Sequence, residues 1–156
     1  MLEAMLDNLL QTIKIDISTG DIITPDAVEY SYNLMFENRT ISLWTYNLET
    51  LLAEKLETMI ARSIANTRIR DFYDIYIISQ KESIDLEILK KAFLAVSKKR
   101  NTLDKISDFN NILDSIETND TMKQLWNNYC YNSFFIEELT WEEIIASVKS
   151  LAEKVL

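Results

Sequence analysis

The feature that most constrains the fold is residues 46–78, because their apolar side chains recur at helical spacing. Residues 48–65 place one broad apolar face on a helix, and residues 69–80 form a second helix that is apolar almost all round. Asn66 and Thr67 separate the two helices, and Thr67 is placed to cap the second one. The sequence therefore predicts a pair of packed helices at the centre of the chain.

Charged side chains fall inside the apolar face of the first helix. Lys55 and Arg62 lie among its leucines and isoleucines, while the opposite face carries Thr50, Glu54 and Glu57. Burying an unpaired ammonium costs several kcal/mol, so a lysine in this position must lose its charge or find an anion.

The second helix repeats this pattern with the opposite sign. Asp71 and Asp74 share one face with Ile75 and Ile78. Two interpretations stay open at this point. The cations of the first helix can pair with the two aspartates as a structural network, or the four charged residues can form a site for a ligand.

The composition restricts the chemistry that the chain can perform. It has no histidine and a single cysteine, Cys130, so Ser-His-Asp and Cys-His mechanisms, an intramolecular disulfide and a cysteine zinc site are excluded. The only glycine, Gly20, begins neither a P-loop nor a dinucleotide fingerprint. Carboxylate, lysine and metal-ion chemistry remain. One glycine and one proline in 156 residues favour long helices, and the net charge of −9 disfavours polyanion binding over the whole surface.

A small β element is expected before the helix pair. Residues 13–18 alternate apolar with polar side chains, which predicts a strand that projects Asp16. A second strand is expected at residues 41–46, paired with the first strand or with one adjacent to it. Residues 1–12 are interpreted as a short amphipathic helix or an irregular lead-in, and residues 26–38 as an irregular segment.

The chain beyond residue 80 is expected to be helical throughout. Asp85 caps a helix that ends near residue 99, and a capping-box pattern of Thr140 and Glu143 opens the last helix. Further helices fit residues 107–116 and 120–131. A basic cluster in this region is either a solvated helix face or a phosphate contact; its members are Lys90, Lys91, Lys98, Lys99, Arg100 and Lys105.

Four patches of sequence carry a family resemblance. They are KIDIS at residues 14–18, GDIITP at residues 20–25, LETLLAEKL at residues 48–56 and TRIRDFYD at residues 67–74. In their order and spacing the chain resembles the nucleotidyltransferase toxins of the AbiEii/AbiGii family, which are the toxin halves of bacterial abortive-infection toxin–antitoxin systems.

The resemblance implies a polymerase-beta-like nucleotidyltransferase fold that moves a nucleotide from an NTP to an RNA acceptor, with tRNA one established acceptor class among relatives. It implies that Lys55 contacts the triphosphate, that Asp71 is a catalytic carboxylate and that Asp16 lies at a Mg²⁺ site. Metal-assisted phosphoryl chemistry of this kind needs no histidine. The supporting residues expected around this site are Arg62, Arg70 and Asp74.

The chain also departs from the family pattern. The first family motif is a Gly-Ser turn followed by a D-x-D or D-x-E pair on a strand, and this sequence has no Gly-Ser and no D-x-D. Its only D-x-E begins at Asp85, downstream in the helical part. We therefore expect the carboxy-terminal portion of such an enzyme, inactive alone. The sheet edge that such a portion exposes predicts self-association.

Taken together, the sequence predicts an α+β, mainly α chain with a partial nucleotidyltransferase core at residues 1–80 and a helical lobe at residues 81–156. The expected function is the nucleotidyltransferase-like toxin component of a type IV, AbiE-like abortive phage-infection system, with an antitoxin as a possible partner. The alternative is a non-enzymatic helical module that binds a partner protein or nucleic acid. No apolar run reaches the length of about 18 residues that a membrane span needs, and a cytoplasmic location is expected.

Overall fold

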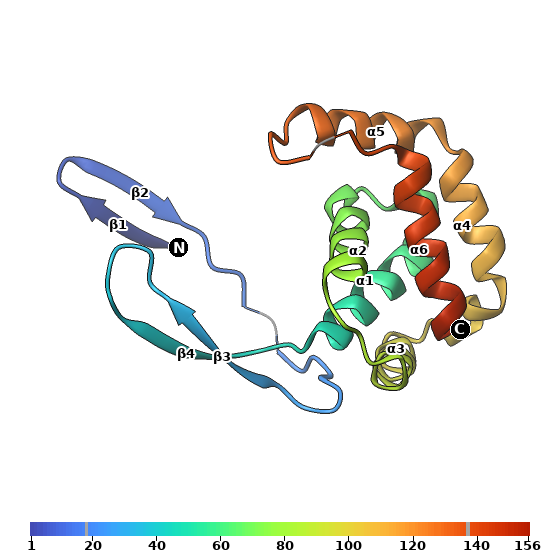
Figure 1. The fold of residues 1–156 in the computed structure, drawn as a ribbon, viewed down its shortest axis with the longest axis horizontal. Helices are drawn as coiled ribbons and strands as arrows, with labels where there is room; N and C mark the ends of the chain where they lie inside the picture. The colour runs from blue at the N-terminus through green and yellow to red at the C-terminus, as the bar shows by residue number, and fades with distance from the viewer. Residues whose placement is uncertain (18, 137) are drawn as a thin grey trace.

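The computed structural model describes residues 1–17, 19–136 and 138–156, which form an N-terminal arm and a helical body (Figure 1). The arm is the described part of residues 1–46, and the helical body begins at residue 47. The arm carries two β-hairpins and extends away from the helices, which pack against one another. This arrangement confirms the predicted α+β, mainly α class.

The helical body holds the helices that the periodicity predicts at the centre and in the second half of the chain. The pair expected at residues 48–65 and 69–80 and the helix expected at 120–131 are confirmed, while the one expected at 107–116 begins and ends two residues later. In chain order the helices are α1 (Leu48–Arg62), the 3₁₀ turn η1 (Ser63–Ala65), α2 (Ile69–Lys81), α3 (Leu86–Arg100), the 3₁₀ turn η2 (Leu103–Asp108), α4 (Phe109–Thr118), α5 (Asp120–Tyr131) and α6 (Trp141–Val155).

Capping side chains explain where several of these helices begin. The Asp85 carboxylate accepts hydrogen bonds from two backbone N–H groups of the first turn of α3, as predicted. The capping box of Thr140 and Glu143 at the start of α6 is also present. The prediction that Thr67 caps α2 is wrong, because the Asn66 side chain instead accepts the backbone N–H two residues further on, at 3.0 Å.

Helix α1 lies at the centre of the body and has no solvent face along its middle turns. Leu52, Leu56 and Met59 are fully buried in the core, and Thr50 and Glu57 are buried on the other side of the same helix. Helix α3 packs along that second side. Full burial of a leucine stabilises a fold by about 1.5–3 kcal/mol relative to exposure, so α1 carries much of the core.

The buried core is one cluster that runs from Leu52 on α1 to Val155 on α6. The predicted division into residues 1–80 and 81–156 stays a prediction, because packing between helices does not define which part folds alone.

Aromatic rings pack against one another within the core. The ring centroids of Phe72 and Trp141 are 5.4 Å apart.

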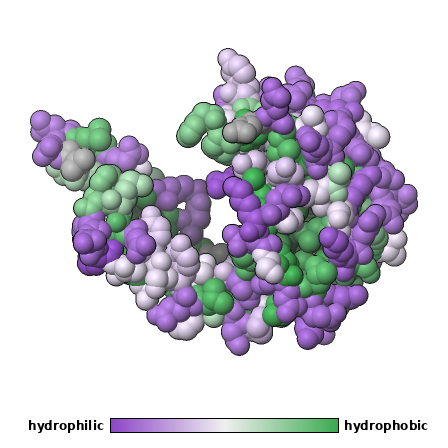
Figure 2. Space-filling model, in the orientation of Figure 1, coloured by the Kyte–Doolittle hydropathy of each residue, from purple (hydrophilic) through white to green (hydrophobic). Residues whose placement is uncertain are grey.

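The arm consists of two separate antiparallel hairpins. β1 (Leu2–Leu6) pairs with β2 (Leu9–Ile13), and β3 (Val28–Asn33) pairs with β4 (Thr40–Thr45). All residues of β2 and β3 are exposed. Figure 2 shows hydrophobic side chains over the arm. Its most exposed large apolar side chains are Met1, Met5, Ile17, Met35, Phe36 and Trp44.

The structure corrects the expectations for the arm. Residues 1–12 are hairpin and not helix, because Asp7 and Asn8 make a tight turn with Asp7 at a φ of 49°. The strand expected at residues 13–18 is wrong, since only its first residue belongs to β2, residues 14–17 have no regular structure and residue 18 lies outside the described residues. Residues 28–33, expected to be irregular, form the true partner of β4, which fits their β-branched and aromatic side chains.

Hydrogen bonds join the arm to the start of α1. The Asn47 side chain donates to the carbonyl oxygen of Thr24 at 2.7 Å, and the Thr24 backbone N–H donates to the Thr50 hydroxyl at 3.0 Å. Asn47 also caps α1 by accepting the Thr50 backbone N–H. The same residues therefore begin the helix and fix the arm to it.

Candidate functional site

The candidate site forms where α1 and α2 pack side by side. α1 ends at Arg62, because the φ of 50° at Ser63 leaves the helical region, and η1 then turns the chain back toward α2. The reversal brings Lys55, in the middle of α1, opposite Asp71 and Asp74, which lie one turn apart on α2. The inward charges of both helices therefore meet.

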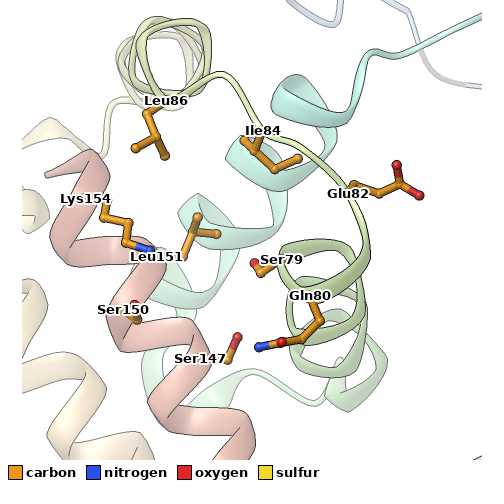
Figure 3. A pocket seen from close by; sticks show the side chains of 9 residues that line it. All are labelled: Ser79, Gln80, Glu82, Ile84, Leu86, Ser147, Ser150, Leu151 and Lys154. Atoms are coloured by element: carbon orange, nitrogen blue, oxygen red, sulfur yellow. The ribbon is translucent and has the colours of Figure 1, made fainter.

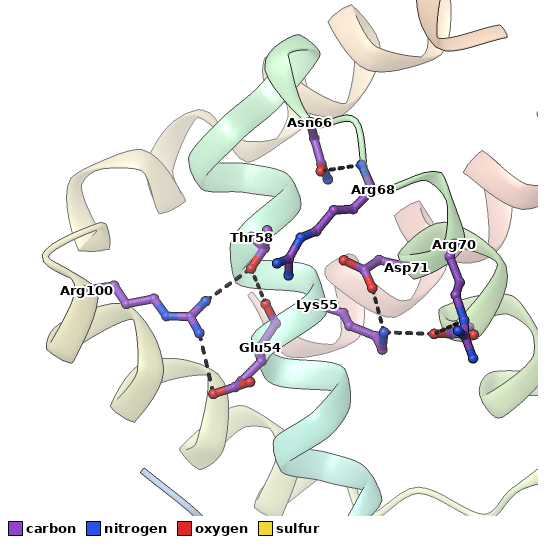
Figure 4. A network of polar contacts seen from close by, with 9 residues as sticks. Glu54, Lys55, Thr58, Asn66, Arg68, Arg70, Asp71 and Arg100 are labelled. Carbon is purple, nitrogen blue, oxygen red and sulfur yellow. Dashed lines mark hydrogen bonds and ion pairs between the residues drawn. The ribbon is translucent and has the colours of Figure 1, made fainter. Parts of the chain in front are cut away.

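Lys55 donates hydrogen bonds to both aspartates (Figure 4). Its Nζ lies 2.6 Å from Asp71 Oδ1 and 2.8 Å from Asp74 Oδ2. The side chains of Lys55 and Asp71 are each 14 % exposed, and that of Asp74 is 26 % exposed. Burial lowers the pKa of Lys55, but the hydrogen bonds and charges of the two carboxylates outweigh it and raise the pKa overall. Lys55 is held as a charged ammonium.

The other predicted site residues, Arg70, Arg62 and Asp16, are exposed and make weaker contact or no contact with the Lys55 cluster. Arg70 is exposed, and its Nε lies 3.8 Å from Asp74 Oδ2, which is a weak contact. Arg62 does not lie in the apolar core as the helical wheel predicts, because it belongs to the last turn of α1 and is exposed. Asp16 lies in the arm, is exposed and pairs with Lys14 at 2.9 Å. The structure brings together Lys55, Asp71, Asp74 and Arg70, but not Asp16.

A second charged cluster, which the sequence interpretation missed, lies on the opposite side of α1. The buried carboxylate of Glu57 accepts hydrogen bonds from the Arg100 guanidinium and from the Thr102 hydroxyl, the latter at 2.8 Å. Arg100 also donates to the Thr58 hydroxyl and lies 3.4 Å from Glu54 (Figure 4). The only sequence signal was that Arg100 belonged to a basic cluster, because a helical wheel does not show which helix packs on the polar face.

Burial raises the pKa of two acidic groups in this region, the Glu54 carboxyl on α1 and the Tyr46 phenol just before α1. Desolvation raises the pKa of the Glu54 carboxyl, and the nearby Arg100 only partly opposes it. Burial, followed by a hydrogen bond with Asp21, raises the pKa of Tyr46 to about 12. Tyr46 therefore stays a neutral phenol at physiological pH.

Cavities adjoin both clusters. Arg68, Arg70 and Asp71 line one of about 540 Å³, and Glu57, Arg68 and Arg100 are among the residues lining another of about 360 Å³. A separate cavity of about 310 Å³ lies between the end of α2 and α6 (Figure 3). No predicted site residue lines that third cavity.

The comparison with protein families identifies the relationship. Residues 1–147 match the family model described as "Nucleotidyl transferase AbiEii toxin, Type IV TA system". The chain belongs to the AbiEii family. The match includes both charged clusters and the whole arm, and it confirms the resemblance drawn from the four sequence patches. No curated protein and no solved structure matches the chain.

The two carboxylates that the resemblance places nearest to a Mg²⁺ site, Asp16 and Asp71, lie in different parts of this AbiEii chain. Within residues 1–17, 19–136 and 138–156, no group of three or more histidine, cysteine, aspartate or glutamate side chains is arranged to hold a metal ion. An oxygen of Asp71 and one of Asp74 already accept hydrogen bonds from Lys55, and Asp16 lies apart from them in the arm. Magnesium is usually bound through one or two carboxylates together with waters and substrate phosphates.

None of the helices in the described ranges has both the length and the apolar character that a membrane span requires.

Proposed function

We propose that this chain supplies the cluster of Lys55, Asp71 and Asp74 to the nucleotide site of an AbiEii-type enzyme, which transfers a nucleotide from an NTP to an RNA acceptor such as tRNA. The supporting observation is the Lys55 ammonium, fixed by two carboxylates within the stretch that the family model matches. An ammonium has three N–H donors. Two are used here, which leaves one for a phosphate oxygen.

Each member of the cluster has a distinct role in this proposal. Lys55 contacts the triphosphate, Asp71 lies beside the reacting group, and Asp74 and Arg70 hold the cluster in place. Free lysine side chains carry about 2 kcal/mol of rotamer entropy, and the two carboxylates have already restricted that freedom before the nucleotide binds. Because the sequence has neither the Gly-Ser turn nor the D-x-D pair of the first family motif, we propose that this chain does not catalyse the transfer alone. A cytoplasmic location and an antitoxin partner belong to the same proposal.

Calorimetric titration with the Mg²⁺ complexes of ATP, GTP, CTP and UTP tests the nucleotide site. Lys55→Ala should weaken binding at least about tenfold, which corresponds to the loss of one charge-assisted hydrogen bond. Lys149→Ala is a matched control, because Lys149 on α6 also contacts two carboxylates, Asp114 and Glu117, which both lie on α4. Absence of nucleotide binding by the wild-type chain, or equal losses in both variants, would contradict the proposal.

The arm favours a second candidate function, a non-enzymatic interaction module. Its hairpins expose large apolar side chains, including Phe36 and Trp44, and the outer edges of both two-stranded sheets lack a neighbouring strand among the described residues. Exposed apolar patches and open strand edges are typical of surfaces that bind another chain. We propose that a second copy of this chain covers them.

Light scattering at about 50 µM, which populates a dimer with a Kd of about 10 µM or below, tests this proposal. We expect a dimer for the wild-type chain and a monomer for the double variant Phe36→Ser/Trp44→Ser. Both substituted residues are exposed, so the helical body should remain folded by circular dichroism. A wild-type monomer at this concentration would contradict self-association. If the chain is a purely non-enzymatic module, Lys55→Ala should change the free energy of unfolding and leave nucleotide binding unchanged.

A further inference from the structure

A cavity of about 360 Å³ at the carboxyl end of α1 has a charge opposite to that of the whole chain. Three guanidinium groups and one carboxylate line it, from Arg62, Arg68, Arg100 and Glu57. The chain as a whole carries a net charge of −9. A concentration of arginines in one concave place within an acidic protein marks a local attraction for anions.

The three arginines differ in how many of their guanidinium N–H groups already donate hydrogen bonds within the protein. Arg100 is held by Glu57 and Thr58, so its guanidinium is fixed in the wall of the cavity. Arg62 and Arg68 are exposed, and in the part of the chain that the structure describes their guanidinium groups have no hydrogen bond or ion pair. A guanidinium offers five N–H donors in a planar fork that fits phosphate oxygens. Two forks are therefore available beside a third that is already positioned.

The position of Arg68 links this cavity to the Lys55 cluster. Arg68 also lines the neighbouring cavity beside Asp71. Figure 4 shows its side chain extending toward α1 between Thr58 and Asp71. Because Lys55 is already paired with two carboxylates, the unpaired positive charge on this part of the surface belongs to the arginines.

One further cation lies at the rim of the cavity. Lys105 donates a hydrogen bond to the carbonyl oxygen of Ala61, which itself lines the cavity, at 2.6 Å. The tertiary fold thus places two members of the basic cluster noted in the sequence, Arg100 and Lys105, against the second half of α1. Several cations along one surface suit a ligand with more than one phosphate.

We propose that the cavity lined by Arg62, Arg68 and Arg100 is a phosphate-binding site. Arg62 and Arg68 donate to the phosphate oxygens, and Arg100, whose charge is paired with Glu57 and Glu54, forms a fixed part of the wall. The phosphates come either from the phosphodiester backbone of an RNA or from a nucleoside triphosphate. The inference rests on the geometry of the cavity and does not require that the chain catalyse nucleotide transfer.

The double variant Arg62→Gln/Arg68→Gln tests the site. Both residues are exposed, so the fold should be retained, which circular dichroism checks. The matched control is Lys14→Gln/Arg39→Gln, which removes the same charge from exposed positions in the arm. One probe is a fluorescein-labelled single-stranded RNA of about 12 nucleotides, followed by anisotropy over a range of salt concentrations. The other is ATP without magnesium, followed by calorimetry.

We expect the arginine double variant to lose at least about tenfold in affinity for RNA, and the salt dependence of log K to become shallower by about 1.4, or 0.7 for each lost contact to a single strand. The control variant should bind like the wild type. A loss confined to ATP assigns the site to a triphosphate, a loss confined to RNA assigns it to the phosphodiester backbone, and a loss of both identifies a general phosphate site.

Equal affinities in the two double variants, or no binding of either probe by the wild-type chain, would overturn the phosphate site. The Lys55→Ala variant separates this outcome from a failure of the proposed function. If Lys55→Ala leaves nucleotide binding unchanged while the arginine double variant loses RNA, the nucleotide role of Lys55 fails and the arginine site stands. If only Lys55→Ala affects binding, the reverse holds.

Discussion

Two lysines in this protein have nearly the same local chemistry and different surroundings. Lys55 on α1 contacts Asp71 and Asp74 on α2, at 2.6 and 2.8 Å. Lys149 on α6 contacts two carboxylates on α4, both at 2.6 Å. In both clusters the two acidic residues are three positions apart on one helix. The Lys149 side chain is 29 % exposed, about twice the value for Lys55, and its partners Asp114 and Glu117 are 64 % and 38 % exposed.

The spacing of charged residues alone therefore does not mark a functional site. Water and mobile ions can replace either partner in the Lys149 cluster, so the net value of those ion pairs is small. In the Lys55 cluster, removing one charge leaves the others partly shielded from water, so each residue depends on the rest. This mutual dependence is consistent with the binding role proposed for the Lys55 cluster.

The largest expected difference between the clusters is in the free energy of unfolding. Lys55→Ala leaves two neighbouring carboxylates without their cation and should destabilise the fold by about 2–3 kcal/mol, near the low end for a buried pair because the cluster is partly exposed. Lys149→Ala should cost less than about 1 kcal/mol. Urea unfolding followed by circular dichroism measures both values. Similar costs for the two variants would show that burial does not separate the clusters.

A smaller difference is expected in alkaline solution. The carboxylate partners raise the pKa of both lysines above the ordinary value of 10.5. A group whose pKa is raised by folding stabilises the native state fully below its unfolded pKa, and this contribution disappears as the pH rises through the folded pKa. The stability gap between the wild type and Lys55→Ala should therefore be constant up to about pH 10 and shrink above it.

The matched measurement on Lys149→Ala should show the same direction with a smaller gap throughout. Chemical denaturation at a series of pH values follows both gaps. A Lys55 gap that widens above pH 10.5, the ordinary lysine value, would mean that the carboxylates do not hold the ammonium in its charged form.

The smallest expected difference is in the response to salt. Raising the ionic strength from about 0.05 M to 1 M shortens the Debye length to about 3 Å, which screens exposed charges more than buried ones. The contribution of Lys149 should fall close to zero, while that of Lys55 should change by only a few tenths of a kcal/mol. Thermal unfolding of the wild type and both alanine variants across this range measures the effect. An equal fractional loss in both clusters would contradict the burial argument.

Local signals allowed much of the helical body to be predicted from the sequence. The helical periodicity of residues 48–65 and 69–80, the Asp85 cap and the capping box of Thr140 were sufficient, because each depends on residues only a few positions apart. The arm was predicted less well. Its first hairpin depends on a two-residue turn of Asp7 and Asn8 with Asp7 in the left-handed region, which the pattern of apolar residues does not indicate.

The inward position of Lys55 on its helix was enough to predict that it needs an anion and that Asp71 and Asp74 can provide one, since an inward cation on one helix requires a nearby partner. The other side of α1 could not be predicted in this way. There the guanidinium of Arg100, 43 positions away, pairs with the buried Glu57 carboxylate, which the helical wheel places opposite the apolar face. Periodicity records which side chains share a face of a helix, but not how many neighbouring helices cover it.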